Sequence, residues 1–180
     1  MAGLKGQLLI ANGGLHDPNF RQTVVLVAEH DENGALGIVL NRPADISVER
    51  VVPPLARIVD ETTPLFFGGP VQPDSAVVVA EADDPEFLSL PVFGAIGILT
   101  GDVSEDTIAR IRRARVYAGY AAWGARQLDG ELVRNDWILE PALVGDVFSA
   151  DPSHLWGTVL RRKGGKHAML ATMPFDPTTN

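Results

Sequence analysis

Four side chains near the start of the chain are of the kinds that bind metal ions. They are His16, Asp17, Glu29 and His30, and imidazole and carboxylate groups together suit zinc or another divalent ion. Their spacing does not match HExxH, and Glu29 and His30 are neighbours on a predicted strand, where consecutive side chains point to opposite faces. The sequence therefore predicts no metal site. It favours a capped turn at His16 and Asp17, before Pro18, and a strand end at His30.

The chain also lacks clear sequence motifs for covalent catalysis or phosphate binding. It contains no cysteine, which removes thiolate nucleophiles, disulfides and cysteine zinc sites. It contains no G-x-S-x-G or S-x-x-K pattern of the serine enzymes, and no glycine loop that binds phosphate. The paired glycines in GGLHDPNF and FFGGPV are typical of tight turns. These observations favour a protein that is not an enzyme and has no cofactor, and they assign no catalytic residue.

A third polar group surrounds a predicted helix in GYAAWGARQLDGELVRNDWIL. Gln127 and Glu131 are four residues apart, so they share one helix face. Trp123 precedes this helix and Trp137 follows it. Together they could form the rim of a site for a small polar ligand or a partner protein. The alternative, which the pattern favours, is that the tryptophans pack in the core and the Gln–Glu pair lies on the surface.

The segment TVVLVAEHDENGALGIVLNRP predicts a β-hairpin that positions several of these residues. Residues 24–30 and 35–41 are rich in β-branched side chains. Asn33 and Gly34 lie between them and accept the positive φ of a tight turn. Because both faces of the two strands are apolar in the middle, we expect the hairpin to be central in its sheet and covered on both sides.

The predicted register of this hairpin places His30 opposite Gly37 and Leu26 opposite Asn41, so all four share a face. His30 and Asn41 are nevertheless roughly 13 Å apart along the strands, at about 3.3 Å per residue. No direct His–Asn pair can therefore form within the hairpin. Any chemistry at His30 would need partners from elsewhere in the chain.

The remaining segments predict a mixture of strands and helices. A helix is expected at 104–115, where Ser104 caps the start and arginines favour the end. A later helix carries an apolar stripe of Leu155, Trp156, Val159 and Leu160. Further strands are predicted at 6–11, 64–71, 75–81, 92–100, 116–124 and 136–140, and short helices at 47–60 and 125–135. Hairpins exclude a purely parallel sheet, so the expected fold class is α+β, with a mixed, largely antiparallel sheet and helices packed on it.

Composition and charge indicate one domain over residues 1–180, with a loose tail at 174–180. The chain is 46% hydrophobic and carries a net charge of −8, and residues 1–100 hold 5 basic against 13 acidic side chains. Such acidity disfavours direct nucleic-acid binding. The basic clusters at 110–115 and 161–166 are expected at helix ends, where the helix dipole stabilises cations. No stretch has the pattern of a signal peptide or membrane span, so no membrane association is expected.

Three motifs make the chain resemble the AlgH/YqgE family of bacterial proteins. They are GQLLIANGGLHDPNFRQTVVLVAEHDENGALGIVLNRP, FFGGPV and GYAAWGARQLDGELVRNDWIL, in this order and spacing. The resemblance extends over nearly the whole chain to about Glu140. The motif positions that it carries over are Asp17, Phe20, Glu29, His30, Gly34, Ala35, Gly37, Asn41, Gly68, Gly69, Pro70, Gly119, Trp123, Gln127, Leu128, Glu131 and Trp137.

The resemblance implies a cytoplasmic bacterial protein with a bifurcated sheet rolled into a pseudo-barrel. Some members are labelled transcriptional regulators. Because this chain is acidic and has no recognisable DNA-reading element, we expect any regulation to be indirect, through an unknown protein partner. The expected function is a non-enzymatic regulatory or protein-interaction module. The alternative is a small-ligand-binding protein or enzyme with a polar cleft around His30, Asn41, Gln127 and Glu131.

Overall fold

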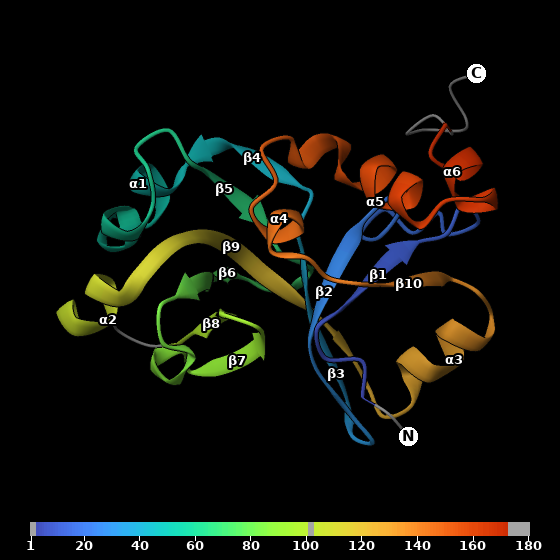
Figure 1. Ribbon diagram of the computed structural model, residues 1–180, viewed down its shortest axis with the longest axis horizontal. Coiled ribbons are helices and arrows are strands. Elements are labelled where there is room, and N and C mark those ends of the chain that lie inside the picture. The colour runs from blue at the N-terminus through green and yellow to red at the C-terminus, as the bar shows by residue number, and fades with distance from the viewer. Residues whose placement is uncertain (1–2, 101–102, 173–180) are drawn as a thin grey trace.

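A computed structural model describes residues 3–100 and 103–172, and its strands form one large, branched sheet (Figure 1). The predicted tail at 174–180 lies outside the described residues. A branch pairs β4 (Pro43–Ser47) with β5 (Pro64–Phe67), and β5 lies parallel to β9. The main path is antiparallel throughout and runs in the order β10 (Trp137–Pro141), β1 (Gln7–Ala11), β2 (Val24–Asp31), β3 (Gly34–Val39), β9 (Ile111–Trp123), β6 (Val71–Ala82), β8 (Ile96–Leu99) and β7 (Leu90–Phe93).

The sheet curls without closing into a barrel. Within the described residues, its end strands β10 and β7 are not paired with each other, although β7 comes close to β2. Helices pack around the sheet, which confirms the α+β class. They are α1 (Val48–Val51), η1 (Pro53–Ile58), η2 (Pro85–Phe87), α2 (Glu105–Arg110), α3 (Gln127–Val133), α4 (Val144–Val147), η3 (Pro152–His154), α5 (Leu155–Lys163) and α6 (Lys166–Leu170). In the described part of the chain, none of these helices has the length and apolarity needed to cross a membrane.

Strand β9 belongs to both halves of the sheet. One end pairs with β3 and the rest pairs with β6, and Figure 1 shows it as a long, curved ribbon across the molecule. Gly119 lies where the pairing with β6 is interrupted and has φ +74°. A Cβ there would lie 2.5 Å from the Gly69 oxygen and 2.8 Å from the Val71 oxygen. Only glycine fits this close approach of two backbones.

The predicted helix at 104–115 is wrong in its second half. Ser104 does cap α2, because its hydroxyl accepts a hydrogen bond from the Thr107 amide. The helix ends at Arg110, however, and β9 begins at Ile111. The long pairing of β9 with β6 overrides the local helix propensity, which is a weak determinant when an apolar strand can be buried. The predicted strand at 92–100 is likewise two strands, β7 and β8, joined by a turn at Gly94 with φ +52°.

The β2–β3 hairpin forms as predicted, but its register is different. His30 pairs with Ala35, and Leu26 pairs with Ile38. The turn begins earlier than expected, because the Asp31 carboxylate accepts a hydrogen bond from the Asn33 amide at 2.7 Å and favours a turn at this point. A bulge at residue 28 then moves His30 off the face that carries Leu26. The predicted shared face of His30 and Leu26 is therefore wrong.

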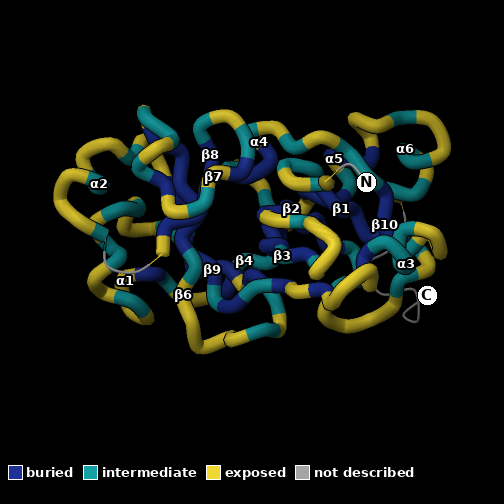
Figure 2. The backbone as a smooth tube through the Cα atoms, turned by 90° about the horizontal axis from the view of Figure 1, so that it is seen from below, coloured by how far each residue is buried: buried dark blue, intermediate teal, exposed yellow. Residues whose placement is uncertain are grey.

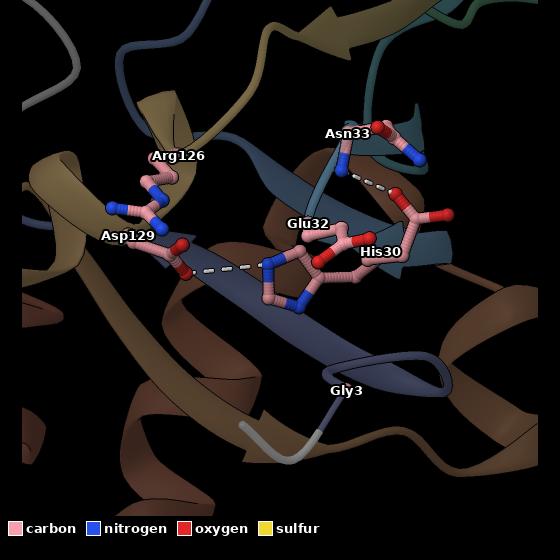
Figure 3. Close-up of a pocket in the computed structure, with 7 residues that line it drawn as sticks. Gly3, His30, Glu32, Asn33, Arg126 and Asp129 are labelled. Atoms are coloured by element: carbon pink, nitrogen blue, oxygen red, sulfur yellow. Dashed lines mark hydrogen bonds and ion pairs between the residues drawn. The ribbon is translucent and has the colours of Figure 1, made fainter.

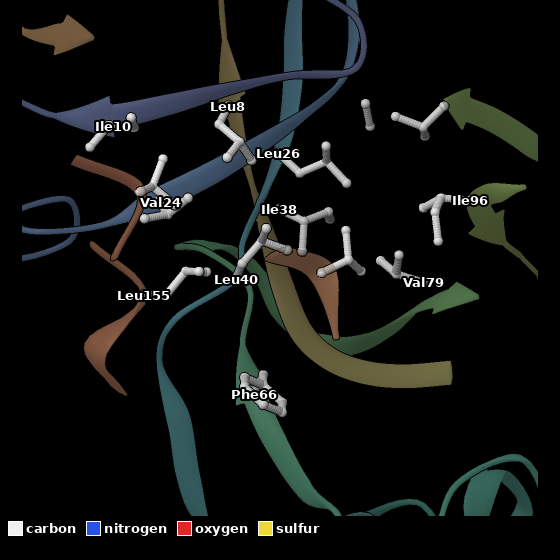
Figure 4. Close-up of a cluster of buried hydrophobic side chains, with 14 of the residues drawn as sticks. Leu8, Ile10, Val24, Leu26, Ile38, Leu40, Phe66, Val79, Ile96 and Leu155 are labelled. Atoms are coloured by element: carbon white, nitrogen blue, oxygen red, sulfur yellow. The ribbon is translucent and has the colours of Figure 1, made fainter. Parts of the chain in front are cut away.

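Both faces of the hairpin are buried, as predicted. One face contributes Leu26 and Ile38 to the largest apolar cluster, which lies inside the curve of the sheet and also contains the stripe of α5 (Figure 4). The other face contributes Val25 and Val27 to a second cluster beneath α3. Figure 2 shows the buried backbone concentrated along the strands and the exposed backbone in the peripheral loops and helices. The polar motif residues of the hairpin, Glu29, His30 and Asn41, therefore lie near the ends of its strands.

Candidate functional site

The predicted Trp–Gln–Glu group is joined by the carboxylate of Glu131. The indole nitrogens of Trp123 and Trp137 both donate to its Oε2, at 2.6 Å and 3.1 Å. Its Oε1 accepts from Gln127 Nε2 at 3.5 Å. Gln127 in turn accepts a hydrogen bond from the Gly124 amide at 3.0 Å. Glu131 thus links β9, α3 and β10 through the two tryptophans and its own helix.

The two tryptophans lie in the protein core. Each is only 5% exposed, and their ring centroids are 6.2 Å apart in an edge-on arrangement. Phe20 packs against both, with centroid distances of 6.0 Å to Trp123 and 5.7 Å to Trp137. Leu128 of α3 is buried in the same cluster. Because these rings are covered, they form the interior of the α3 side of the molecule, and Gln127 stays exposed at its edge.

His30 lies at the end of β2, next to α3 and the N-terminal segment (Figure 3). Its side chain is only 4% exposed. The Leu4 backbone amide donates to His30 Nδ1 at 3.1 Å. The other ring nitrogen, Nε2, lies 3.3 Å from Asp129 Oδ1. His30 therefore joins three segments that are distant in the sequence.

The contact with the Leu4 amide favours one tautomer of the neutral His30 ring. A nitrogen that accepts a hydrogen bond from an amide carries no proton, so the ring proton of the neutral form lies on Nε2. That N–H lies 3.3 Å from Asp129 Oδ1. Neither nitrogen has a lone pair available for a substrate proton while both contacts hold, which a general base would require. The geometry suits a structural histidine better than a catalytic one.

A pocket of about 750 Å³ opens beside this His–Asp pair. Its charged lining comes from the carboxylates of Asp31, Glu32 and Asp129 and the guanidinium of Arg126. Arg126 immediately precedes α3 and has a left-handed backbone, with φ +61°. A non-glycine residue in this region is strained and needs support from its surroundings. The charged groups of the pocket are therefore three carboxylates and one guanidinium, and the guanidinium belongs to a residue whose backbone is strained.

Asn41 does not line this pocket, and its hydrogen bonds are made elsewhere. Its side-chain oxygen accepts from the Val24 amide at 2.9 Å, and its nitrogen donates to the Gln22 carbonyl at 2.9 Å. Asn41 lines a different pocket, next to α5. The structure therefore does not bring the proposed cleft together: His30 lies at the acidic pocket, Asn41 at the α5 pocket, and Gln127 with Glu131 at the tryptophan pair.

The other candidate residues near the N-terminus are dispersed. His16, Asp17 and Glu29 are all exposed. The Asp17 carboxylate accepts from the Asn19 amide at 2.8 Å, which makes the capped turn that the sequence favours. Glu29 lies on the outer rim of the β2–β3 hairpin beside Trp123. Within residues 3–100 and 103–172, no three His, Cys, Asp or Glu side chains are grouped so that they could hold a metal ion.

Sequence reasoning missed Asp129 and Arg42, which have central positions in the two pockets. Asp129 is two residues from both Gln127 and Glu131, so it points to another side of α3. This spacing was visible in the sequence, but its partner His30 was not. Arg42 donates to the carbonyls of Asn19 at 2.7 Å and Arg21 at 3.1 Å. It thereby holds the loop between β1 and β2 against the end of β3.

The arginines at 110–115 are engaged with neighbouring groups. Arg112 pairs with Asp83, and Arg113 pairs with Glu81. Arg115 donates to the carbonyls of Val147 and Ser149. Burial lowers the pKa of Arg115, and the nearby Arg113 lowers it further, although the Tyr117 side chain opposes this. Arg112, Arg113 and Arg115 lie on β9 rather than at a helix end, whereas Arg110 lies in the last turn of α2 as expected.

Comparison with known proteins finds relatives that match this chain over nearly its whole length. The model of the AlgH-like family matches residues 8–168. A UPF0301 protein from Streptomyces avermitilis is 41% identical over 187 residues, which cover 100% of this chain and 97% of the relative. A UPF0301 protein from Mycolicibacterium smegmatis is 40% identical and covers 97% of this chain and 90% of the relative.

Two solved structures share the fold. The crystal structure of protein DIP2367 from Corynebacterium diphtheriae aligns with a TM-score of 0.84 and 27% identity, over 93% of this chain and 91% of that one. The solution structure of the AlgH protein from Pseudomonas aeruginosa aligns with a TM-score of 0.73 and 31% identity, over 96% of this chain and 95% of that one. The branched sheet is therefore common to all three chains.

Proposed function

The chain belongs to the AlgH-like family, and we propose that it is a non-enzymatic regulatory module of the bacterial cytoplasm that binds a protein partner. The observation that carries this proposal is the bonding of His30. Its Nδ1 accepts a hydrogen bond from the Leu4 amide, and its Nε2 lies 3.3 Å from Asp129 Oδ1. Glu131 and Asn41 are engaged in the same way. Hydrogen bonds within the protein occupy these polar groups, which supports a role in holding the fold.

A surface for the partner lies at the end of β5. Phe67 is 55% exposed, and it borders a groove of about 300 Å³ that also contains Val39, Pro70 and Arg42. Exposed aromatic side chains beside a shallow apolar groove are typical anchors of protein interfaces. The groove borders the FFGGPV motif, which is one of the three that mark the family.

Regulation through a protein rather than through DNA is supported by the charge distribution. The chain has a net charge of −8, which repels phosphate backbones. Arg112 and Arg113 are paired with acidic side chains, so much of the positive charge on β9 is neutralised. We therefore propose that any effect on transcription is indirect.

Affinity purification from a lysate of the native bacterium tests this proposal. The wild-type protein is expected to retain one protein at stoichiometric amounts, and Phe67→Ser is expected to lose it. Val133→Ser is the matched control, because Val133 is an exposed apolar residue, 83% exposed, on α3 and outside the groove. Failure of the wild type to retain a stoichiometric protein, or equal retention by Phe67→Ser, would contradict the proposal.

A second candidate function is the binding of a small ligand in the acidic pocket beside His30. Its volume of about 750 Å³ lies within the range of pockets that hold small molecules. A ligand that binds there would raise the melting temperature, because it binds the native state. A thermal-shift screen of metabolites tests this function. A hit should disappear in Arg126→Ala but persist in Arg134→Ala, which removes an arginine at the far end of α3.

A further inference from the structure

A second pocket, of about 290 Å³, lies between the start of α5 and the end of β3. Its wall contains the cations Arg42 and Arg161 and the neutral polar residues Gln22, Asn41 and Ser153. His154 also lines it but pairs with Asp151 at 2.8 Å. Two arginines at one small pocket are notable in a chain whose net charge is −8.

Arg42 is fixed in this pocket by its own contacts. Its two terminal nitrogens donate to the carbonyls of Asn19 and Arg21, which leaves further N–H groups of the guanidinium to face other partners. Burial lowers the pKa of Arg42, the neighbouring Arg21 lowers it further, and the more weakly acting Asp17 raises it. An anion at this point would relieve the repulsion between the arginines and compensate for the lost hydration.

Arg161 reaches back along α5 toward the same pocket. Its terminal nitrogens lie 3.2 Å and 3.3 Å from the position that a Cβ on Gly157 would occupy, one helical turn earlier and also on the pocket wall. The other basic residues of this helix end are engaged elsewhere: Arg162 pairs with Asp146, and Lys163 pairs with Glu140. Gly157 therefore makes room for the Arg161 guanidinium beside the first turn of α5.

The backbone at the pocket is strained as well. Gln22, which lines it, has φ +52°, a conformation that non-glycine residues adopt at a cost of roughly 1–3 kcal/mol. The buried side chain of Asn41 holds it there through the hydrogen bond to its carbonyl. Strained backbone of this kind is concentrated at ligand sites, where surrounding contacts fix it. The strain is independent of the charge, and both observations concern the same pocket.

From these observations we propose that this pocket binds the phosphate group of a small ligand, with Arg42 and Arg161 as its cationic partners. Guanidinium groups donate two parallel hydrogen bonds to phosphate oxygens, which makes arginine the common residue for this task. The pocket volume of about 290 Å³ accommodates free phosphate or a short phosphate ester. The site shares Arg42 with the Phe67 groove and is separate from the acidic pocket, and phosphate binding there does not require either candidate function.

Calorimetric titration of the full-length protein with inorganic phosphate tests the site. The ionic strength is held constant with potassium chloride. The expected result is saturable binding of one phosphate per chain. Arg161→Gln should weaken it about tenfold, which corresponds to roughly 1.4 kcal/mol for one lost charge-assisted contact. Arg50→Gln is the matched control, because it removes the same charge from the exposed end of α1 and should leave binding unchanged.

A second variant covers the case in which loss of an arginine disturbs folding. Gly157→Ala places a methyl group where Arg161 lies, and an alanine in a helix does not destabilise it. It should weaken phosphate binding while the melting temperature is maintained. Tighter binding of glycerol 3-phosphate than of phosphate would identify an ester as the ligand class, and equal binding would identify free phosphate. Absence of saturable binding in the wild type, or equal weakening by Arg161→Gln and Arg50→Gln, would overturn the proposal.

Discussion

The carboxylate of Glu131 shows how one side chain can organise a region of the fold. It accepts from two buried indoles at once, and these indoles come from strands on either side of α3. A buried N–H group without a partner costs about 1–3 kcal/mol. Glu131 is therefore a stabilising residue whose effect depends on its two aromatic donors.

Replacement of Glu131 by alanine is expected to lower the free energy of unfolding by about 2–4 kcal/mol, because both indole N–H groups lose their acceptor. Urea denaturation followed by tryptophan fluorescence measures the change. Gln127→Ala is the control, since Gln127 is exposed and makes a long contact of 3.5 Å to Glu131; it should cost less than about 1 kcal/mol. Equal losses for the two variants would contradict this role of Glu131.

Tyr117 is the opposite case, a polar group that is buried without a partner. Its side chain is fully buried against Phe66. Among the described residues, its hydroxyl is the buried side-chain polar atom that has no hydrogen-bond partner. Burial raises the pKa of Tyr117 well above its ordinary value, although the nearby Arg115 opposes this. The hydroxyl therefore contributes a desolvation cost.

Tyr117→Phe is expected to raise the free energy of unfolding at pH 7 by about 1 kcal/mol, because the cost of the unpaired hydroxyl is removed. Above about pH 10, unfolded tyrosine loses its proton while folded Tyr117 keeps it, so wild-type stability falls by about 1.4 kcal/mol per pH unit relative to the variant. Denaturation at pH 7 and pH 10.5 measures both effects. A variant less stable than wild type at both values would show that the hydroxyl has a partner.

The residue scale also shows what the sequence could reveal about the site. Its local patterns indicated the capped turn at Asp17 and the common helix face of Gln127 and Glu131. It could not indicate that Asp129 meets His30, because their contact joins segments 99 residues apart through tertiary packing. Residues that meet through the fold cannot be paired from local spacing alone.

At the scale of elements, β9 decides the shape of the sheet. Its register with β6 is interrupted between the pairs Val71–Tyr120 and Ala76–Ala118, and Gly119 occupies that interruption with positive φ. The bend allows one strand to continue from β6 to β3. The course of β9 therefore depends on a glycine at position 119, which has no side chain.

Gly119→Ala is expected to lower the free energy of unfolding by about 3 kcal/mol, through the left-handed backbone and the overlap with the Gly69 carbonyl. Gly145→Ala is the matched control, because a Cβ at Gly145 in α4 would meet no atom within 4 Å. Thermal or urea denaturation compares the two. Similar stabilities would indicate that β9 can relax at this bend.

Prediction of the elements from sequence succeeded where the signal is local. The cap at Ser104 and the apolar stripe of α5 are formed as expected. It failed where a partner strand decides the outcome. The segment 111–115 has the composition of a helix end but pairs with β6, and the bulge at residue 28 has no sequence signal that alternation can show. Strand register depends on the neighbouring strand, which a local pattern does not contain.

At the scale of the whole molecule, the two halves of the sheet share β9. The segment before β9 supplies β3 and β6, which pair with opposite ends of it. The segment after it supplies β10, which pairs with β1. Neither part of the chain contains a complete sheet, so we expect one cooperative unfolding transition.

Separate production of fragments 1–103 and 104–180 tests this expectation. Each fragment alone should be largely unfolded by far-UV circular dichroism, because the first lacks β9 and the second lacks β3, β5 and β6, which pair with β9. When the fragments are mixed, they should form a one-to-one complex with the spectrum of the intact chain. A cooperative thermal transition in fragment 1–103 alone would contradict this picture.

The pairing of β9 with several strands should also slow the exchange of its backbone amide hydrogens with solvent. Tyr117 and Ala118, in the middle of β9, pair with β6 on one edge and with β5 on the other, so solvent reaches their amides only when the strand is freed from the sheet. They should be the last protons to exchange and should report the global stability of the protein. Because the same strand also pairs with β3 at its end, we expect its separation from β6 to disturb both halves of the sheet.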